Sequence, residues 1–205
     1  MPGRKERELQ FRTDIVLDAA VELFSETSYE DTPVEAIARR AEISVATLYA
    51  LFDGKRDIYK ATISRAHDQF FVEIRARVAE TRGPLEQMRA IISYHLENFS
   101  RNARSFRAFA RSTNVAGMEL KNEVEREATS GKREFYEMVV DICARGLDEG
   151  VFRRGLPATE LALALTSIPH SVLTYWLDRQ DGEEGELLDL LPEALTLAER
   201  LVGAD

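Results

Sequence analysis

The sequence predicts an all-α fold of about nine helices. Apolar residues recur with the period of an amphipathic helix along nearly all of the 205-residue chain, and no stretch alternates as a β-strand does. Short turn signals such as Asp53-Gly54 separate the periodic stretches. Hydrophobic residues make up 44% of the chain and charged residues 31%, so a sizeable core can form beneath a charged surface.

The expected helices follow one another with short connections. Gly150 ends one helix, and Pro169 is expected to kink the next. An acidic loop, "DGEEGE", precedes the last helix. The periodic stretches cover residues 12–27, 34–41, 45–52, 55–81, 84–100, 103–114, 118–149, 157–179 and 187–202.

Capping signals mark the second and third helices. Thr32 and Glu35 have the spacing of a capping box, with Pro33 at the first helical position. Ser44 is expected to be the N-cap of the third helix. Because the turn between these two helices is too short for a loop, the stretch has the organisation of a helix-turn-helix.

The net charge of −9 argues mildly against nucleic acid as a partner. Any DNA binding must therefore come from a local arrangement of charge. The one early basic bias is the N-terminal tip, where Arg4, Lys5, Arg7 and Arg12 are interspersed with acidic residues. This tip could be a flexible arm that reaches phosphates, but mixed tails are more often solvated, and we favour the solvated interpretation.

The chain is expected to be a cytoplasmic protein without a membrane partner. No apolar run approaches the roughly 20 residues that cross a bilayer, and the N-terminus lacks the apolar segment of a secretory signal. Cys143 is the single cysteine, so no internal disulfide can form, which fits a reducing compartment.

The third helix has the pattern of a DNA reader. Leu48 and Phe52 are expected to face the core, which leaves the side chains of Val45, Ala46, Thr47, Tyr49 and Ala50 outward. The start of each of the second, third and fourth helices can receive a phosphate oxygen on its free amides. The alternative, a merely buried amphipathic helix, does not explain an exposed Tyr49. The predicted DNA-binding residues are Thr32, Ser44, Val45, Ala46, Thr47, Tyr49 and Lys55.

These residues have distinct expected roles. Val45 and Ala46 could touch thymine methyl groups, and Thr47 could bind a base edge or a phosphate. Tyr49 offers a hydroxyl at phosphate distance, and Lys55 adds a full positive charge at the start of the fourth helix.

Residues 16–59, "VLDAAVELFSETSYEDTPVEAIARRAEISVATLYALFDGKRDIY", resemble the DNA-binding domain of the TetR/AcrR transcriptional regulators. Ser28 and Glu42 depart from the family pattern, which usually has glycine at both positions. If the backbone is left-handed there, each departure costs on the order of 1 kcal/mol.

The resemblance implies two domains. Residues 1–54 would be the helix-turn-helix DNA-binding domain, and residues 55–205 the ligand-binding and dimerisation domain, connected by helix 55–81. The protein would bind a pseudo-palindromic double-stranded DNA operator as a homodimer. Because members of this family are usually repressors, the protein would be a repressor that an unidentified small-molecule effector releases from DNA.

Two features of the C-terminal region agree with this expectation. The last two helices, about 157–179 and 187–202, are apolar on more than one face, which predicts a homodimer interface, although a fully internal helix pair is the alternative. An aromatic-rich stretch between 84 and 176 suits a small hydrophobic or amphipathic effector, although aromatics at helical spacing are more often ordinary core. The predicted ligand-binding residues are His95, Phe99, Phe106, His170 and Trp176.

Four arginines share one face of the sixth expected helix and the residues before it: Arg101, Arg104, Arg107 and Arg111. They either form an entrance for an anionic effector or pair with the glutamates just downstream, and we favour the pairing. The partners would be Glu119, Glu123, Glu125 and Glu127.

The sequence predicts no enzyme, no catalytic residues, no cofactor and no metal site. Cys143 and the histidines His67, His95 and His170 lack metal-ligand spacing. The alternative to a ligand-responsive repressor is a helical protein-interaction or activator module without a small-molecule response.

Overall fold

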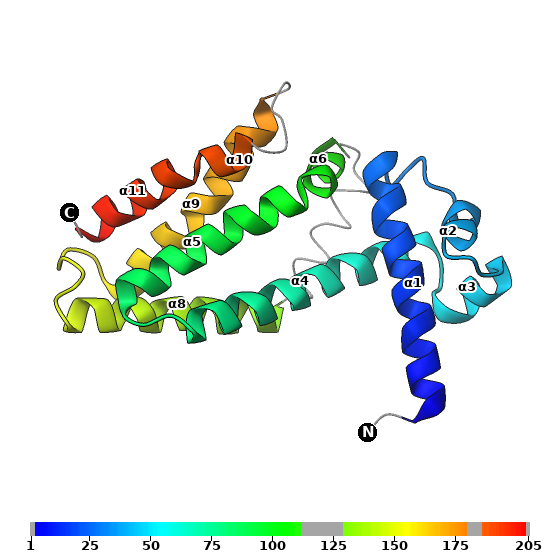
Figure 1. Cartoon of the computed structure of the whole chain (residues 1–205), viewed down its shortest axis with the longest axis horizontal. Coiled ribbons are helices and arrows are strands. Elements are labelled where there is room, and N and C mark those ends of the chain that lie inside the picture. Colours follow the sequence, from blue (N-terminus) through cyan, green and yellow to red (C-terminus); the bar gives the residue numbers. More distant parts are fainter. Residues whose placement is uncertain (1–2, 112–128, 180–185, 204–205) are drawn as a thin grey trace. The chain divides into compact units, whose positions relative to one another are not determined.

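The computed structural model describes residues 3–111, 129–179 and 186–203 (Figure 1). Within these ranges the regular elements are helices, and the predicted all-α class is confirmed. The glutamates predicted to pair with the arginine face, Glu119, Glu123, Glu125 and Glu127, lie outside the described residues, as does the side chain of Arg111.

The chain divides into two compact units. The first contains residues 1–67 and 104–128, and the second contains residues 68–103 and 129–205. Helix α4 (Lys55–Ala79) therefore contributes its first turns to one unit and the remainder to the other. The predicted domains, residues 1–54 and 55–205, stay a prediction.

The first unit is built on α1 (Arg4–Glu26), α2 (Val34–Arg40) and α3 (Val45–Leu51), with the start of α4 and the described part of α6 (Ala103–Arg111). Figure 1 shows α2 and α3 on one side of α1. The buried side chains of these helices form one core: Val16, Leu17, Ala19, Ala20, Phe24, Ile37, Ala38, Ala41, Leu48, Phe52, Ile58 and Tyr59.

Helix α1 begins earlier than the expected residue 12. It starts at Arg4, with the Gly3 amide donating to Glu6 Oε2 at 2.6 Å. The expected start relied on the first apolar residues of the stripe. However, the polar residues before that stripe contain no helix breaker, so the helix continues through them to Gly3.

The capping box predicted for α2 is wrong. Pro33 is the N-cap, without a side-chain cap hydrogen bond. The Thr32 hydroxyl turns inward and donates to the Ser28 carbonyl at 2.6 Å, with Thr27 Oγ1 at 2.8 Å. Thr32 thus stabilises the turn before α2, because a buried hydroxyl is costly unless it is hydrogen-bonded.

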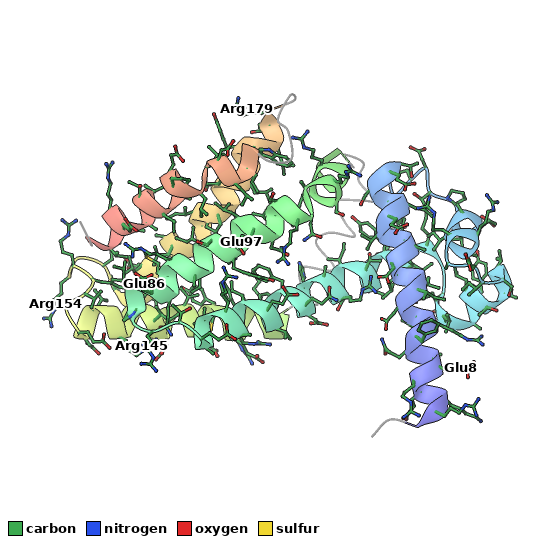
Figure 2. All side chains as sticks on the ribbon, viewed as in Figure 1. Glu8, Glu86, Glu97, Arg145, Arg154 and Arg179 are labelled. Atoms are coloured by element: carbon green, nitrogen blue, oxygen red, sulfur yellow. The ribbon has the colours of Figure 1, made fainter. Side chains whose placement is uncertain are left out.

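The second unit contains α5 (Pro84–Arg101), α8 (Thr129–Asp148), α9 (Ala158–Asp178), α10 (Glu186–Asp189) and α11 (Leu191–Val202). Helix α5 contacts the other four, and α9 also packs against α8, α10 and α11. In Figure 2, Glu86 and Arg145 lie at one end of this unit. There Arg145 of α8 donates to Gln87 Oε1 of α5 at 2.6 Å.

Proline begins a new helix at one place in the last helices and is accommodated within a helix at another. The single helix expected at 187–202 is two helices, because Pro192 occupies the first turn of α11 and favours a new helix start after Leu190. Helix α9, in contrast, runs through Pro169 to Asp178.

Candidate functional site

The turn between α2 and α3 takes the left-handed conformation that a glycine would normally provide. Glu42 has φ 54°, and among the described residues it is the one non-glycine with positive φ. The Ile43 amide donates to the Ala38 carbonyl at 3.0 Å, which closes the turn. Ser28, the other departure, is not left-handed: its hydroxyl accepts from the Asp31 amide at 3.1 Å and donates to Asp31 Oδ2 at 2.9 Å.

Ser44 caps α3 as predicted. Its Oγ accepts a hydrogen bond from the Thr47 amide at 3.0 Å and lies 2.8 Å from Thr47 Oγ1. The two hydroxyls therefore form one ordered pair at the start of the helix. Such a pair can accept from, or donate to, a group approaching α3 without first having to become ordered.

The orientation of α3 also agrees with the expectation. Leu48 is fully buried and Phe52 nearly so, whereas the Tyr49 side chain is 52% exposed. Ala46 is exposed beside it, and Val45 is half-buried against the core. The outer surface of α3 is thus a small apolar face flanked by hydroxyls, and its sequence "VATLYAL" contains no charge.

Lys55 is held in place by the turn before α2. Its Nζ donates to the Glu30 carbonyl at 2.9 Å and lies 4.8 Å from the centroid of the Tyr29 ring. Tyr29 in turn packs on Tyr59, with ring centroids 4.8 Å apart. Burial raises the pKa of Tyr29 above its usual value, so the ring beneath the ammonium stays neutral. Sequence reasoning missed Tyr29 because this contact joins residues far apart in the chain.

Thr32 differs from the other predicted DNA-binding residues. Its side chain is 1% exposed and its hydroxyl is used inside the turn. The Thr32 side chain therefore presents no polar atom at the surface, and any contribution to an interface passes through the backbone that it positions.

Several arginines of the first unit have structural partners. Arg40 pairs with Glu22 at 2.8 Å and with Glu26 at 3.0 Å, which ties α2 to α1. Arg65 of α4 pairs with Asp18 at 2.7 Å. Hydrogen bonding to Arg40 lowers the pKa of Glu26, so this carboxylate is ionised at neutral pH.

In the second unit, three of the predicted ligand-binding residues come together. The rings of His95 and His170 lie 5.8 Å apart, and Phe99 is 6.0 Å from His95 and 5.7 Å from His170. Phe70, Phe71 and Phe135, which sequence reasoning missed, complete what we call the aromatic cluster: Phe70, Phe71, His95, Phe99, Phe135 and His170.

Both histidines of the aromatic cluster use the same backbone contact. Nδ1 of His95 donates to the Ile91 carbonyl at 2.8 Å, and Nδ1 of His170 donates to the Thr166 carbonyl at 3.0 Å. Burial lowers the pKa of His95 to about 4, so its ring is neutral at physiological pH. In this tautomer Nε2 of His95 is an acceptor, which gives the cluster a polar atom without charge.

The remaining two predicted ligand-binding residues lie elsewhere. Trp176 is buried on α9, the helix that also carries His170. Phe106 is half-buried on the part of α6 that belongs to the first unit.

Arg101, the first member of the predicted arginine face, forms an ion pair inside the second unit. Its guanidinium lies 3.5 Å from Glu73 Oε2 and 5.7 Å from the centroid of the Tyr94 ring. The Tyr94 hydroxyl donates to the same Glu73 oxygen at 2.8 Å. Burial, followed by the bond to Glu73, raises the pKa of Tyr94 to about 12. Arg101 is therefore paired with an acidic residue, but this residue is Glu73 on α4, which precedes Arg101 in the chain.

Comparison with known proteins identifies the class. Residues 16–62 match the family model "Bacterial regulatory proteins, tetR family", and this range contains α2, the turn and α3. The chain is 28% identical over 126 residues to the HTH-type transcriptional repressor KstR of Rhodococcus jostii, an alignment that covers 62% of this chain and 58% of KstR. The helix-turn-helix is thus that of a DNA-binding transcriptional regulator.

Solved structures extend the likeness to the fold of the whole chain. FadR from Bacillus subtilis in complex with stearoyl-CoA has a TM-score of 0.71 and 22% identity, covering 93% of this chain and 98% of FadR. AibR in complex with isovaleryl coenzyme A and operator DNA has a TM-score of 0.65 and 17% identity, covering 93% and 98%. The family match is thus confined to residues 16–62, and the solved structures show that the whole chain shares the fold of TetR-family regulators.

The proteins of the matched family are non-enzymatic DNA-binding regulators. Within the described parts of the chain, helices that could traverse a lipid bilayer are not found.

Proposed function

We propose that this protein is a ligand-responsive repressor that binds a pseudo-palindromic operator as a homodimer and is released by a small amphipathic effector. The observation that carries the proposal is the surface of α3, where a capped helix presents Tyr49 and Ala46 outward over a buried Leu48. A helix so presented fits the major groove.

Base reading on this surface is sparse. The apolar face formed by Val45 and Ala46 suits thymine methyl groups, and the Ser44–Thr47 hydroxyl pair suits a base edge or a phosphate. Tyr49 and Lys55 would bind phosphates on either side. Since α3 carries no charge, part of the specificity would come from DNA shape and half-site spacing.

Homodimerisation is supported by exposed apolar side chains on the last helices. Leu163 and Tyr175 on α9 are 60% and 53% exposed, and Leu197 on α11 is 56% exposed. Burying them against a second copy would remove apolar surface from water and place two α3 helices on one duplex.

An acyl-CoA is the effector class that the comparisons favour, because FadR and AibR were each solved with an acyl-CoA bound. The aromatic cluster, with the neutral His95 among phenylalanines, suits the apolar acyl part of such a ligand. Repression is proposed because KstR is a transcriptional repressor.

The experiment is a gel shift with the full-length protein and duplex DNA from its own promoter region, with and without palmitoyl-CoA. We expect a dimer–DNA complex that weakens as salt rises and is released by palmitoyl-CoA, while free coenzyme A has no effect. A protein that binds DNA but ignores every acyl-CoA would instead be the alternative, an activator or interaction module without a small-molecule response. A protein that binds no duplex would contradict the proposal altogether.

A further inference from the structure

We propose that the exposed N-terminal part of α1, residues 4–12, is a second DNA-binding element that contacts phosphates outside the site of α3. The proposal rests on the proposed DNA binding by α3 and adds a contact that begins before residue 16, where the match to the family model starts. We call residues 4–12 the projecting segment.

The projecting segment is helical and lies outside the buried core of its unit. Every side chain from Arg4 to Arg12 is exposed, and the first buried residue of α1 is Val16. At 1.5 Å per residue, α1 extends about 18 Å from Val16 to Arg4. Figure 1 shows this end of α1 reaching past α2 and α3, and Figure 2 labels Glu8 on it.

The first turn of the projecting segment holds cations that lack a carboxylate partner. Arg12 pairs with Glu8 at 2.8 Å, but among the residues that the structure describes Arg4 and Lys5 form no ion pair. Cations are disfavoured in the first turn of a helix, where the macrodipole is positive. A phosphate next to Arg4 and Lys5 would offset that repulsion as well as bind both side chains.

The uncharged surface of α3 makes such a contact useful. Affinity for duplex DNA comes largely from cations that replace the counterions of phosphates. Helix α3 supplies no cation, and Arg40 and Arg65 are held by acidic residues within the unit. Arg4 and Lys5 are therefore suited to supply charge that α3 lacks.

The exposed apolar residues of the projecting segment argue for DNA over an anionic membrane. Leu9 and Phe11 are both exposed, but residues two apart on a helix point to nearly opposite sides. The segment thus has no single apolar face to insert into a bilayer. A duplex requires only the cations, so it is the partner that this arrangement fits.

The test measures how DNA affinity depends on salt for three full-length proteins. The duplex is the one that wild-type protein enriches from a random-sequence library. The test variant is Arg4→Gln with Lys5→Gln. The control variant, Arg153→Gln with Arg154→Gln, loses the same charge from an exposed loop of the second unit, where Figure 2 labels Arg154. Circular dichroism confirms that all three are equally helical.

Each phosphate contact contributes about 0.9 to the slope of log affinity against log salt concentration. The slope of the test variant should therefore be shallower than that of wild type by about one to two. The control should keep the wild-type slope. A wild-type slope in the test variant, or an equal loss in the control, would overturn the second contact. So would binding to phosphatidylglycerol vesicles that depends on Arg4 and Lys5 while the DNA slope does not.

The two proposals fail differently. If wild-type protein enriches no duplex, DNA binding by α3 fails, and the second contact fails with it. If wild-type protein enriches a duplex and the test variant binds it with an unchanged slope, only the second contact fails.

Discussion

Glu42 holds the α2–α3 turn in a left-handed backbone conformation, at φ 54°. An L-residue with a Cβ atom pays a steric penalty there that glycine avoids. Ser28, at the other position where glycine was expected, shows no such penalty, since it is stabilised by two hydrogen bonds to Asp31. Two similar departures in sequence thus have different physical consequences.

This difference leads to the first prediction. Glu42→Gly should raise the free energy of unfolding by about 1 kcal/mol, because it relieves the left-handed strain. Ser28→Gly should lower it, because the hydrogen bonds to Asp31 are lost and glycine adds entropy to the unfolded chain. Urea unfolding of both variants measures the change, and equal effects in the two would contradict this account.

His95 gives a second prediction at the scale of one residue. Burial lowers its pKa to about 4 in the folded protein, below the ordinary value of 6.5, so the unfolded state binds the proton more readily. Stability contributed by the neutral ring is present above pH 6.5 and is lost as pH falls towards 4, by on the order of 3 kcal/mol in total.

Urea midpoints at several pH values between 7.5 and 4.5 test the role of His95. The variant His95→Gln, which cannot titrate in this range, should lose less stability than wild type as pH falls. If both proteins lose stability in parallel, the dependence comes from other groups.

At the scale of elements, the connection before α2 positions the start of α4. Tyr29 and the Glu30 carbonyl hold the Lys55 ammonium, and Tyr29 packs on Tyr59. One hydrogen bond to the Glu30 carbonyl leaves the other ammonium hydrogens for a phosphate. Lys55 is therefore oriented in the absence of DNA, which would lower the entropic cost of the proposed phosphate contact.

A third prediction tests whether the ring of Tyr29 or its hydroxyl group orients Lys55. Tyr29→Phe keeps a ring beneath Lys55 and should leave DNA affinity near that of wild type, whereas Tyr29→Leu should weaken it several-fold. Fluorescence anisotropy with a labelled operator measures both. Loss of affinity in Tyr29→Phe as well would show that the hydroxyl, rather than the ring, matters.

For the molecule as a whole, the proposed regulation would require two copies of the chain. The exposed apolar residues Leu163, Tyr175 and Leu197 lie on α9 and α11, the helices expected to form the interface. A dimer would also present two α3 helices and two projecting segments to one operator. Affinity should then depend on the subunit equilibrium, because linked sites bind with a raised effective concentration.

The fourth prediction concerns this interface. Leu163→Glu should convert the dimer to a monomer and weaken operator binding by at least tenfold. Val72→Glu is the matched control, since Val72 is 59% exposed on α4 and Leu163 is 60% exposed on α9. Sedimentation velocity reports the subunit state of each variant. A monomer in the control, or a dimer in Leu163→Glu, would contradict the assignment of the interface.

The all-α class, the Ser44 cap and the inward direction of Leu48 could be predicted from the amino-acid sequence, because each depends on helical period or on residues within one turn. The contacts between distant residues could not be predicted in this way. The ring of Tyr29 under Lys55, the meeting of His95 with His170 and the inward turn of the Thr32 hydroxyl all depend on packing. Local pattern records the face on which a side chain lies, whereas its partner depends on how the elements pack.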